Sequence, residues 1–173
     1  MELSTLALRI GEVAQLSGQF VLRSGATSNT YFDKYLFESD PQLLRAIAEH
    51  LVPMIPEGTE LLAGLELGGV PVATALSYAS GLPAVFVRKK AKDYGTAKLA
   101  EGPSIDGKRV LIVEDIITSG GQVVLSTKDL RDRGAIVHSA VCVIDREQGG
   151  SEALADSNIA LGALFTRSAI ESS

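Results

Sequence analysis

The sequence VLIVEDIITSGGQ, residues 110–122, predicts the centre of the fold. It begins with four apolar residues, most of them β-branched, which indicate a short buried strand. Two adjacent carboxylates, Glu114 and Asp115, close that strand, and a Thr-Ser-Gly-Gly turn leads into a predicted helix. The stretch is therefore interpreted as a strand, turn and helix with polar groups at the carboxyl end of the strand.

This unit combines donors for an anion with acceptors for hydroxyl groups. Free backbone N–H groups in the turn over residues 118–122, at the positive end of the following helix, suit a phosphate. Glu114 and Asp115 suit vicinal sugar hydroxyls, or a divalent cation held directly or through water. The alternative is an ordinary strand, turn and helix whose acidic pair is solvated. The residues by themselves predict a phosphate near a sugar.

The complete pattern over residues 110–122 resembles the phosphoribosyl pyrophosphate (PRPP) signature of the type I phosphoribosyltransferases. This resemblance makes the solvated acidic pair the weaker interpretation. It implies that Glu114 and Asp115 hold the ribose hydroxyls of PRPP. It also implies that the turn binds the 5-phosphate, through Thr118, Ser119, Gly120, Gly121 and Gln122.

Predicted strands and helices alternate on both sides of this unit. Strands are indicated at residues 60–64, 84–87, 136–144 and 159–165, and helices at residues 71–80, 122–133 and 151–156. Such alternation predicts an α/β fold with a central parallel sheet flanked by helices, whose binding loops lie at the carboxyl ends of the strands. The resemblance implies the same architecture, the type I phosphoribosyltransferase fold.

The N-terminal part departs from this alternation. Apolar spacing and β-propensity predict a helix at residues 3–16, a hairpin at residues 19–25 and 30–37, and a helix at residues 42–52. Asp40 and Pro41 mark the start of the second helix, as a cap and a first-turn proline. We expect residues 1–37 to form a small hood on a single domain that spans residues 1–173.

Composition and charge narrow the class of protein. The chain has 173 residues, of which 46% are hydrophobic and 21% are charged, as in ordinary globular domains. Its net charge of −5 disfavours a nonspecific nucleic-acid binder, and no apolar run is long enough to span a bilayer. The single cysteine, Cys142, lies in an apolar run and is expected in the core. These features favour a cytoplasmic protein over a secreted one.

A second glycine-rich turn, GLELGGVP at residues 64–71, follows a predicted strand and opens a predicted helix. Its free amides suit another anion, although a tight packing turn is the more frequent explanation for such a turn alone. Placed before the signature, it resembles the pyrophosphate loop of the same family. The resemblance implies PRPP contacts from Glu66, Leu67, Gly68 and Gly69, with a cis peptide between the first two.

A basic cluster, RKKAKDYG at residues 88–95, opens a stretch without clear periodicity. A solvated basic turn is the ordinary interpretation, but this cluster follows a strand beside the other two loops. It resembles the catalytic loop of the orotate phosphoribosyltransferases. The resemblance implies that Arg88, Lys89 and Lys92 are catalytic and bind PRPP. We expect a mobile lid at about residues 89–107.

Tyr94 departs from that family pattern, which has histidine at this position. A phenol can donate a hydrogen bond to a pyrophosphate oxygen, but it does not become cationic near neutral pH. Tyr94 is therefore expected to share the catalytic and PRPP-binding role as a neutral donor.

Two further segments resemble base-binding parts of the orotate phosphoribosyltransferases. In FVLRSGATSNTYFD, residues 20–33, a basic residue and two consecutive aromatics match those that meet the pyrimidine. In IDREQG, residues 144–149, the arginine matches one that pairs with the orotate carboxylate, a task that suits a planar guanidinium. Each segment alone is equally well a packed hairpin or a surface ion pair. The resemblance implies orotate contacts from Arg23, Tyr31, Phe32, Thr118 and Arg146.

The resemblance implies a reaction between orotate and PRPP that gives orotidine 5′-monophosphate and pyrophosphate in the synthesis of UMP. The implied cofactor is Mg²⁺, carried mainly by PRPP, with Glu114 and Asp115 as candidates for contacts through water. A homodimer is also implied, in which each lid reaches over the site of the partner. Neither nucleic acid nor a membrane is an expected partner.

Two alternatives stay open at this point. One is a phosphoribosyltransferase for a purine base, although Arg23, Tyr31, Phe32 and Arg146 suit an anionic pyrimidine better. The other is a regulator of the same fold that binds PRPP without transferase activity. Such a regulator would need a basic face or an appended DNA-binding segment, which the net charge and length disfavour.

Overall fold

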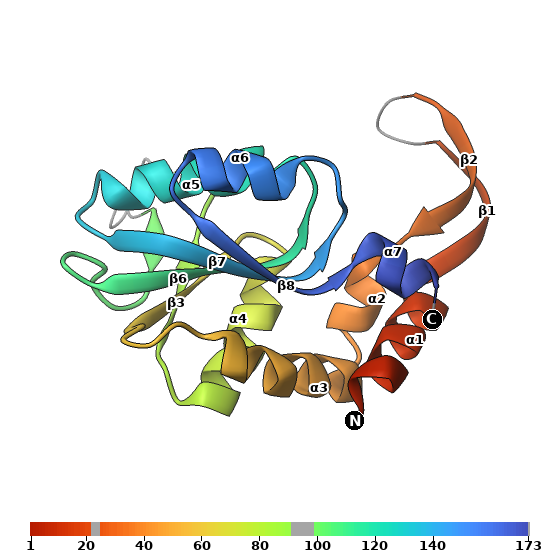
Figure 1. Cartoon of the computed structure of the whole chain (residues 1–173), viewed down its shortest axis with the longest axis horizontal. Coiled ribbons are helices and arrows are strands. Elements are labelled where there is room, and N and C mark those ends of the chain that lie inside the picture. The colour runs from red at the N-terminus through yellow and green to blue at the C-terminus, as the bar shows by residue number, and fades with distance from the viewer. Residues whose placement is uncertain (22–24, 91–98, 173) are drawn as a thin grey trace.

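A computed structural model describes residues 1–21, 25–90 and 99–172 of the chain. Within this described part, a six-stranded sheet with helices on both faces forms the centre (Figure 1). The neighbouring strands β4, β3, β6, β7 and β8 are parallel, and a short β5 pairs antiparallel with β4 at the edge. The strands are β3 (Leu61–Leu65), β4 (Ala84–Val87), β5 (Ala100–Glu101), β6 (Arg109–Ile117), β7 (Ile136–Asp145) and β8 (Ala160–Thr166). The predicted α/β fold is confirmed.

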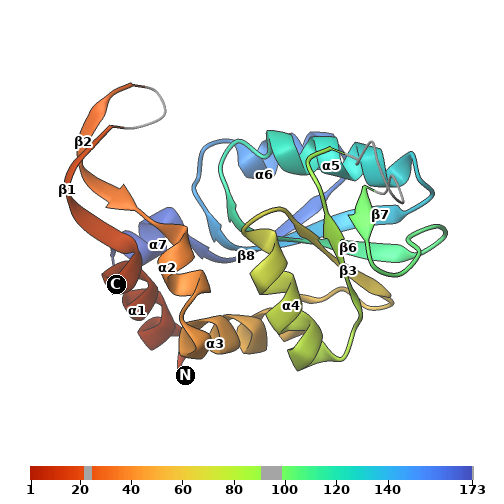
Figure 2. The ribbon, with the colours of Figure 1, turned by 180° about the vertical axis from the view of Figure 1, so that it is seen from behind.

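Helices cover the two faces of the sheet (Figures 1 and 2). On one face lie α5 (Gly121–Arg131) and α6 (Gly150–Asp156), and on the other lie α3 (Pro41–Leu51) and α4 (Gly69–Ser80). Further helical elements are α1 (Leu3–Ala14), α2 (Lys34–Glu38), α7 (Arg167–Glu171) and the 3-10 helix Val52–Met54. Within the described ranges, no helix is long and apolar enough to cross a membrane.

β6 is buried on both sides because the side chains of a strand alternate between the two faces of its sheet. Leu111 and Val113 belong to the core cluster that includes residues of α1, α3 and α4. Val110 and Ile112 belong to the cluster that includes residues of α5 and α6. Cys142 of β7 is fully buried in this second cluster, as predicted.

β1 (Gln15–Val21) and β2 (Thr27–Phe32) form the predicted antiparallel hairpin, which projects from the body beside α1 and α7 (Figures 1 and 2). Its boundaries differ from the prediction, because the first helix ends at Ala14 and residues 34–38 form α2. Asp33 caps α2 by accepting the N–H of Tyr35 at 3.1 Å, and Phe37 is fully buried. Capping and burial outweigh the β-propensity of this aromatic run.

The end of the predicted lid, residues 99–107, is attached to the body. Ala100–Glu101 forms β5, and Leu99 and Ile105 are buried in the core. The sequence predicts a mobile lid to about residue 107, whereas two buried apolar side chains and one short strand pairing anchor residues 99–107 to the body. Residues 91–98 of the predicted lid lie outside the described residues.

The start of α3 follows the prediction closely. Asp40 accepts hydrogen bonds from the N–H groups of Gln42, at 2.8 Å, and Leu43, at 3.1 Å, and Pro41 occupies the first turn. By contrast, α7 was not predicted. It is a single short turn that Thr166 caps by accepting the N–H of Ala169 at 3.2 Å.

Candidate functional site

The candidate site lies at the carboxyl edge of the sheet. Because β4, β3, β6 and β7 are adjacent and parallel, their carboxyl ends share one edge. Residues 66–69 follow β3, Arg88 and Lys89 follow β4, residues 118–122 follow β6, and Arg146 follows β7. The fold therefore brings together segments that lie far apart in the sequence.

The glycine-rich loop at residues 66–69 lies directly against the acidic residues of β6. A Cβ atom on Gly68 would overlap the carboxylate of Asp115, and a Cβ atom on Gly69 would overlap the carbonyl oxygen of Val113. A residue with a side chain cannot approach β6 this closely. The glycines thus allow the loop and the acidic pair to share one surface.

The same loop is joined to the start of the basic cluster. The peptide bond between Glu66 and Leu67 is cis, as predicted. Glu66 Oε1 accepts the N–H of Lys89 at 2.6 Å. Arg88 Nε lies 3.3 Å from Glu101 Oε1 of β5, in a half-exposed ion pair. The end of β4 is therefore held both by the glycine-rich loop and by the edge strand.

Glu114 and Asp115 are buried, at 9% and 1% exposure. Glu114 Oε2 accepts the N–H of Asp115 at 3.2 Å, and Asp115 Oδ1 accepts the N–H of Ile116 at 2.6 Å. Lys34 Nζ of α2 lies 2.6 Å from Asp115 Oδ2. The interpretation of these carboxyl groups as a solvated strand end is excluded, and Asp115 is fixed through both of its oxygens.

Glu38 of α2 adds a third carboxyl group to this pair. Its side chain is 5% exposed and shares a hydrogen bond with the Asp115 carboxyl group. Lys34 and Glu38 are one helical turn apart, so α2 directs both toward Asp115. We call Lys34, Glu38, Glu114 and Asp115 the acidic cluster.

The acidic cluster carries little net charge at neutral pH. Burial, followed by the neighbouring Asp115, raises the pKa of Glu38 to about 9 and likewise raises the pKa of Glu114 to about 9. Burial works to raise the pKa of Asp115 as well, but hydrogen bonds to Glu38 and Lys34 outweigh it and lower that pKa. Two protonated carboxyl groups and one ion pair thus replace three anions. Repulsion of a nearby phosphate is correspondingly weak.

The turn after β6 is open to solvent where α5 begins. Thr118, Ser119, Gly121 and Gln122 are exposed, whereas Gly120 is buried with a φ of 74°. Within the described residues, no side chain caps the start of α5. The first N–H groups of the helix therefore remain available to an anion.

Tyr31 and Phe32 of β2 are the aromatics predicted to contact the pyrimidine. Their side chains point to opposite sides of the hairpin, because successive residues of a strand alternate. Tyr31 is 44% exposed, and its ring centroid lies 5.5 Å from that of Phe20. Phe32 is half-buried, packs against the core and lies 6.4 Å from Phe37 between ring centroids. Tyr31 is thus available to a ligand, whereas Phe32 anchors the hairpin.

Arg146 lies at the end of β7, beside the turn that follows β6. Its N–H donates to the carbonyl oxygen of Ile117 at 2.9 Å, and its side chain is half-buried. Among the described residues its guanidinium has no ion pair, so it is available to an external carboxylate.

Comparison with known proteins identifies the family. Residues 40–160 match the family described as the phosphoribosyl transferase domain. A protein of Nocardioides sp. named orotate phosphoribosyltransferase is 52% identical over 168 residues, which cover 97% of this chain and 94% of that protein. The chain belongs to the orotate phosphoribosyltransferase family.

Solved structures of orotate phosphoribosyltransferases share the fold. The Mycobacterium tuberculosis enzyme in complex with Fe(III) dicitrate has a TM-score of 0.89 at 28% identity, covering 97% of this chain and 98% of that chain. The same enzyme in complex with PRPP has a TM-score of 0.84 at 26% identity and covers 98% of both chains. The predicted type I phosphoribosyltransferase fold is confirmed.

Most of the site residues predicted by resemblance to the orotate phosphoribosyltransferases are located by the structure. Those at the carboxyl edge are Glu66, Leu67, Gly68, Gly69, Arg88, Lys89, Glu114, Asp115, Thr118, Ser119, Gly120, Gly121, Gln122 and Arg146. Tyr31 and Phe32 lie on the hairpin. Arg23, Lys92 and Tyr94 lie outside the described residues.

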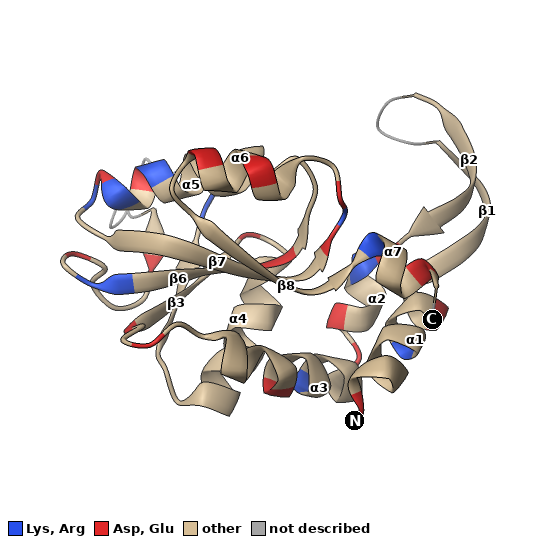
Figure 3. Ribbon diagram, viewed as in Figure 1, with Lys and Arg blue, Asp and Glu red and all other residues tan. Residues whose placement is uncertain are grey.

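Sequence reasoning missed Lys34 and Glu38. Their spacing of four residues would have placed them on one face of a helix, but residues 30–37 were interpreted as a strand. Described charges elsewhere are interspersed, with Lys or Arg near Asp or Glu along α3 and α5 (Figure 3). The acidic cluster is distinguished from these surface charges by its burial.

Proposed function

We propose that this chain transfers the phosphoribosyl group of PRPP to orotate and releases orotidine 5′-monophosphate and pyrophosphate, a step in the synthesis of UMP. Membership of the orotate phosphoribosyltransferase family supports this activity. The observation that carries the proposal is the convergence of residues 66–69, the acidic cluster and residues 118–122 at one edge of the sheet. The relative with bound PRPP supports the sugar substrate.

The ribose and its 5-phosphate are proposed to bind at the end of β6. Glu114 and Asp115 hold the ribose hydroxyls, and a protonated Glu114 donates as well as accepts. Because Lys34 covers Asp115, the sugar reaches Asp115 only after Lys34 shifts. The N–H groups of residues 118–122 bind the phosphate. The low net charge of the acidic cluster allows the phosphate to lie nearby.

The pyrophosphate leaves from C1 of the ribose, and the bond that breaks develops positive charge on the sugar and negative charge on the leaving group. Residues 66–69 hold the pyrophosphate through their amides. Arg88, Lys89, Lys92 and Tyr94 are proposed to stabilise the departing anion. Arg88 would exchange Glu101, its partner in the free chain, for a pyrophosphate oxygen.

Orotate is proposed to bind between the hairpin and Arg146. The half-buried guanidinium of Arg146 pairs with the orotate carboxylate. Arg23, Tyr31 and Thr118 orient the ring so that its N1 faces C1 of the ribose, while Phe32 anchors the hairpin. N1 then bonds to C1 as the bond from C1 to pyrophosphate breaks.

Magnesium is the proposed cofactor. The described residues include no group of three or more His, Cys, Asp or Glu side chains placed to hold a metal ion. The Asp115 oxygens are engaged by Ile116 and Lys34. We propose that PRPP carries the ion, and that Glu114 contacts it through water. When bound, the ion neutralises charge on the pyrophosphate.

We also propose a cytoplasmic homodimer in which each lid reaches over the site of its partner, as the family resemblance implies. A mixture of Arg146→Ala and Lys92→Ala subunits should then regain activity, because one site of the mixed dimer keeps both residues. Activity no higher than that of either parent, with the mixed dimer verified by mass spectrometry, would contradict a shared site.

The transferase activity is tested by supplying PRPP and Mg²⁺ with orotate, uracil, adenine or hypoxanthine. We expect consumption of orotate with release of pyrophosphate and no reaction of the other three bases. PRPP binding without turnover of orotate would overturn the proposal and favour a regulator of the same fold. Turnover of adenine or hypoxanthine would point to a purine enzyme instead.

A further inference from the structure

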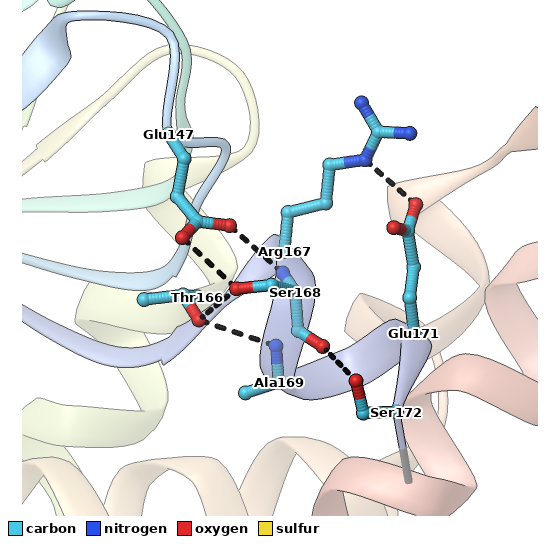
Figure 4. A network of polar contacts seen from close by, with 7 residues as sticks. All are labelled: Glu147, Thr166, Arg167, Ser168, Ala169, Glu171 and Ser172. Carbon is cyan, nitrogen blue, oxygen red and sulfur yellow. Dashed lines mark hydrogen bonds and ion pairs between the residues drawn. The ribbon is translucent and has the colours of Figure 1, made fainter.

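Glu147 makes two hydrogen bonds that join the Arg146 loop to α7 (Figure 4). Its Oε2 accepts the N–H of Ser168 at 2.9 Å, and its Oε1 accepts the Ser168 hydroxyl at 2.9 Å. Glu147 has a φ of 56°, a left-handed conformation that non-glycine residues adopt only when surrounding contacts hold them there. We call this pair of hydrogen bonds the Glu147–Ser168 clasp.

Two further hydrogen bonds, both from main-chain N–H groups, hold Glu147 and its neighbour Arg146. The N–H of Glu147 donates to Asp145 Oδ1 at 2.9 Å, and the N–H of Arg146 donates to Ile117 O at 2.9 Å. The main chain around Arg146 is therefore held by the end of β6, by the end of β7 and, through Glu147, by α7. The point from which the Arg146 side chain leaves the main chain is therefore fixed.

α7 also packs against α1, the helix that leads into the hairpin. Ile170 of α7 is 8% exposed and lies in the core cluster with Leu6 and Ile10 of α1. Gly11 of α1 is close enough for a Cβ there to touch Ile170 at 3.5 Å. Because α1 runs directly into β1, a continuous series of contacts connects Glu147 to the hairpin that carries Tyr31.

We propose that Glu147 is a positioning residue that sets the separation between Arg146 and the hairpin, and so controls affinity for the base and not for PRPP. This inference rests on the proposed function, in which orotate lies between these two parts. In the proposed function PRPP is held by residues 66–69, the acidic cluster and residues 118–122, and none of these residues takes part in the two hydrogen bonds of the clasp. Breaking the clasp should therefore weaken the binding of orotate and leave the binding of PRPP unchanged.

The test compares Glu147→Ala and Ser168→Ala with Glu171→Gln. The control variant removes a different contact of the same helix, the ion pair in which Arg167 Nε lies 2.7 Å from Glu171 Oε1 (Figure 4). We expect KM for orotate to rise about tenfold in Glu147→Ala and by less in Ser168→Ala, which keeps the hydrogen bond from the N–H of residue 168, while KM for PRPP changes less than about twofold in both. Glu171→Gln should leave both constants within about twofold.

Two further variants separate positioning from general stability. Glu147→Gln keeps one acceptor for Ser168 and should raise KM for orotate less than Glu147→Ala does. The double variant Glu147→Ala/Ser168→Ala should be no worse than Glu147→Ala alone, because Glu147→Ala already removes both hydrogen bonds of the clasp. A purely structural role would lower the melting temperature without separating the two KM values.

Equal rises in KM for orotate and PRPP would overturn the inference, as would an unchanged KM for orotate in folded Glu147→Ala protein. Additive effects in the double variant would also contradict it. These outcomes differ from failure of the proposed function, in which the unaltered protein itself would neither bind nor consume orotate.

Discussion

The acidic cluster and the β1–β2 hairpin are proposed to serve the two substrates, and they differ most in burial. Asp115 in the cluster is 1% exposed, whereas Val21 and Tyr31 on the hairpin are 76% and 44% exposed. Charges in the cluster are balanced by close partners, and its residues lie between the sheet and α2. A change in the cluster should therefore affect folding together with PRPP binding, but a change on the hairpin should affect orotate binding alone.

The largest effect is expected from Gly68→Ala. The new Cβ would overlap the Asp115 carboxylate and force the loop at residues 66–69 away from β6. A displacement of this kind should lower PRPP-dependent turnover by about a hundredfold or more. Gly11→Ala is the control, because its Cβ would meet Ile170 only at an ordinary 3.5 Å. Initial rates of pyrophosphate release measure both, and near-normal activity of Gly68→Ala would contradict the close approach.

Lys34→Met should be the next most damaging change. It leaves Asp115 as an unpaired buried charge, which costs about 3 kcal/mol of unfolding free energy, toward the lower limit because Lys34 is 33% exposed. Lys108→Met breaks the exposed ion pair with Glu60, 3.0 Å between Nζ and Oε1, and should cost less than about 1 kcal/mol. Urea unfolding gives the loss of unfolding free energy in each variant. Equal losses would show that the ion pair of Lys34 with Asp115 contributes no more than an exposed surface pair.

Tyr31→Ala tests the hairpin, the second of the two regions compared. Removing an exposed ring that we propose to contact the base should raise KM for orotate about tenfold. Because the ring is 44% exposed, the unfolding free energy should change by less than about 0.5 kcal/mol. Steady-state kinetics and urea unfolding on the same preparation measure both quantities. A large stability loss would mean that the hairpin is part of the folding core.

The smallest effect is expected from Glu38→Gln, and its sign depends on pH. The pKa of Glu38 is about 9 in the folded chain, above its ordinary value of 4.5, so the folded state binds more protons than the unfolded state between these values. Its contribution to stability is present below pH 4.5 and is lost as pH rises toward 9. Glutamine stays neutral, and it can donate to Asp115.

This variant should therefore melt about 2–4 °C higher than the parent at pH 8.5, with a smaller difference at pH 5. Thermal unfolding followed by circular dichroism at both pH values provides the measurement. A variant that is less stable than the parent at pH 8.5 would indicate that Glu38 is ionised in the folded chain.

Much of this architecture could be predicted from local patterns. β4 and the start of α3 have clear sequence signals, namely a short apolar run and the Asp40-Pro41 pair. The glycine-rich loop and the residues around Glu114 could also be assigned, because their motifs are continuous in sequence.

The parts that could not be predicted depend on contacts between distant segments. The aromatic run at residues 30–37 has high β-propensity, but the Asp33 cap, the burial of Phe37 and the pairing of Lys34 with Asp115 make its second half a helix. Glu147 follows Arg146, to which the sequence assigns a role by resemblance, but its own partner, Ser168, belongs to a helix without a distinct sequence signal. In both cases contacts between distant segments determine the structure, and local sequence preferences alone do not.

Cys142, deep in β7, has a practical consequence for experiments on the hairpin. It is the only cysteine of the chain, and burial raises its pKa, so the reactive thiolate is strongly disfavoured. Maleimide or nitroxide reagents should leave the unaltered folded chain unmodified. A cysteine introduced on the exposed face of the hairpin would then carry a single probe, and the response of the hairpin to added orotate could be followed by fluorescence or spin-label spectroscopy without first removing a native thiol.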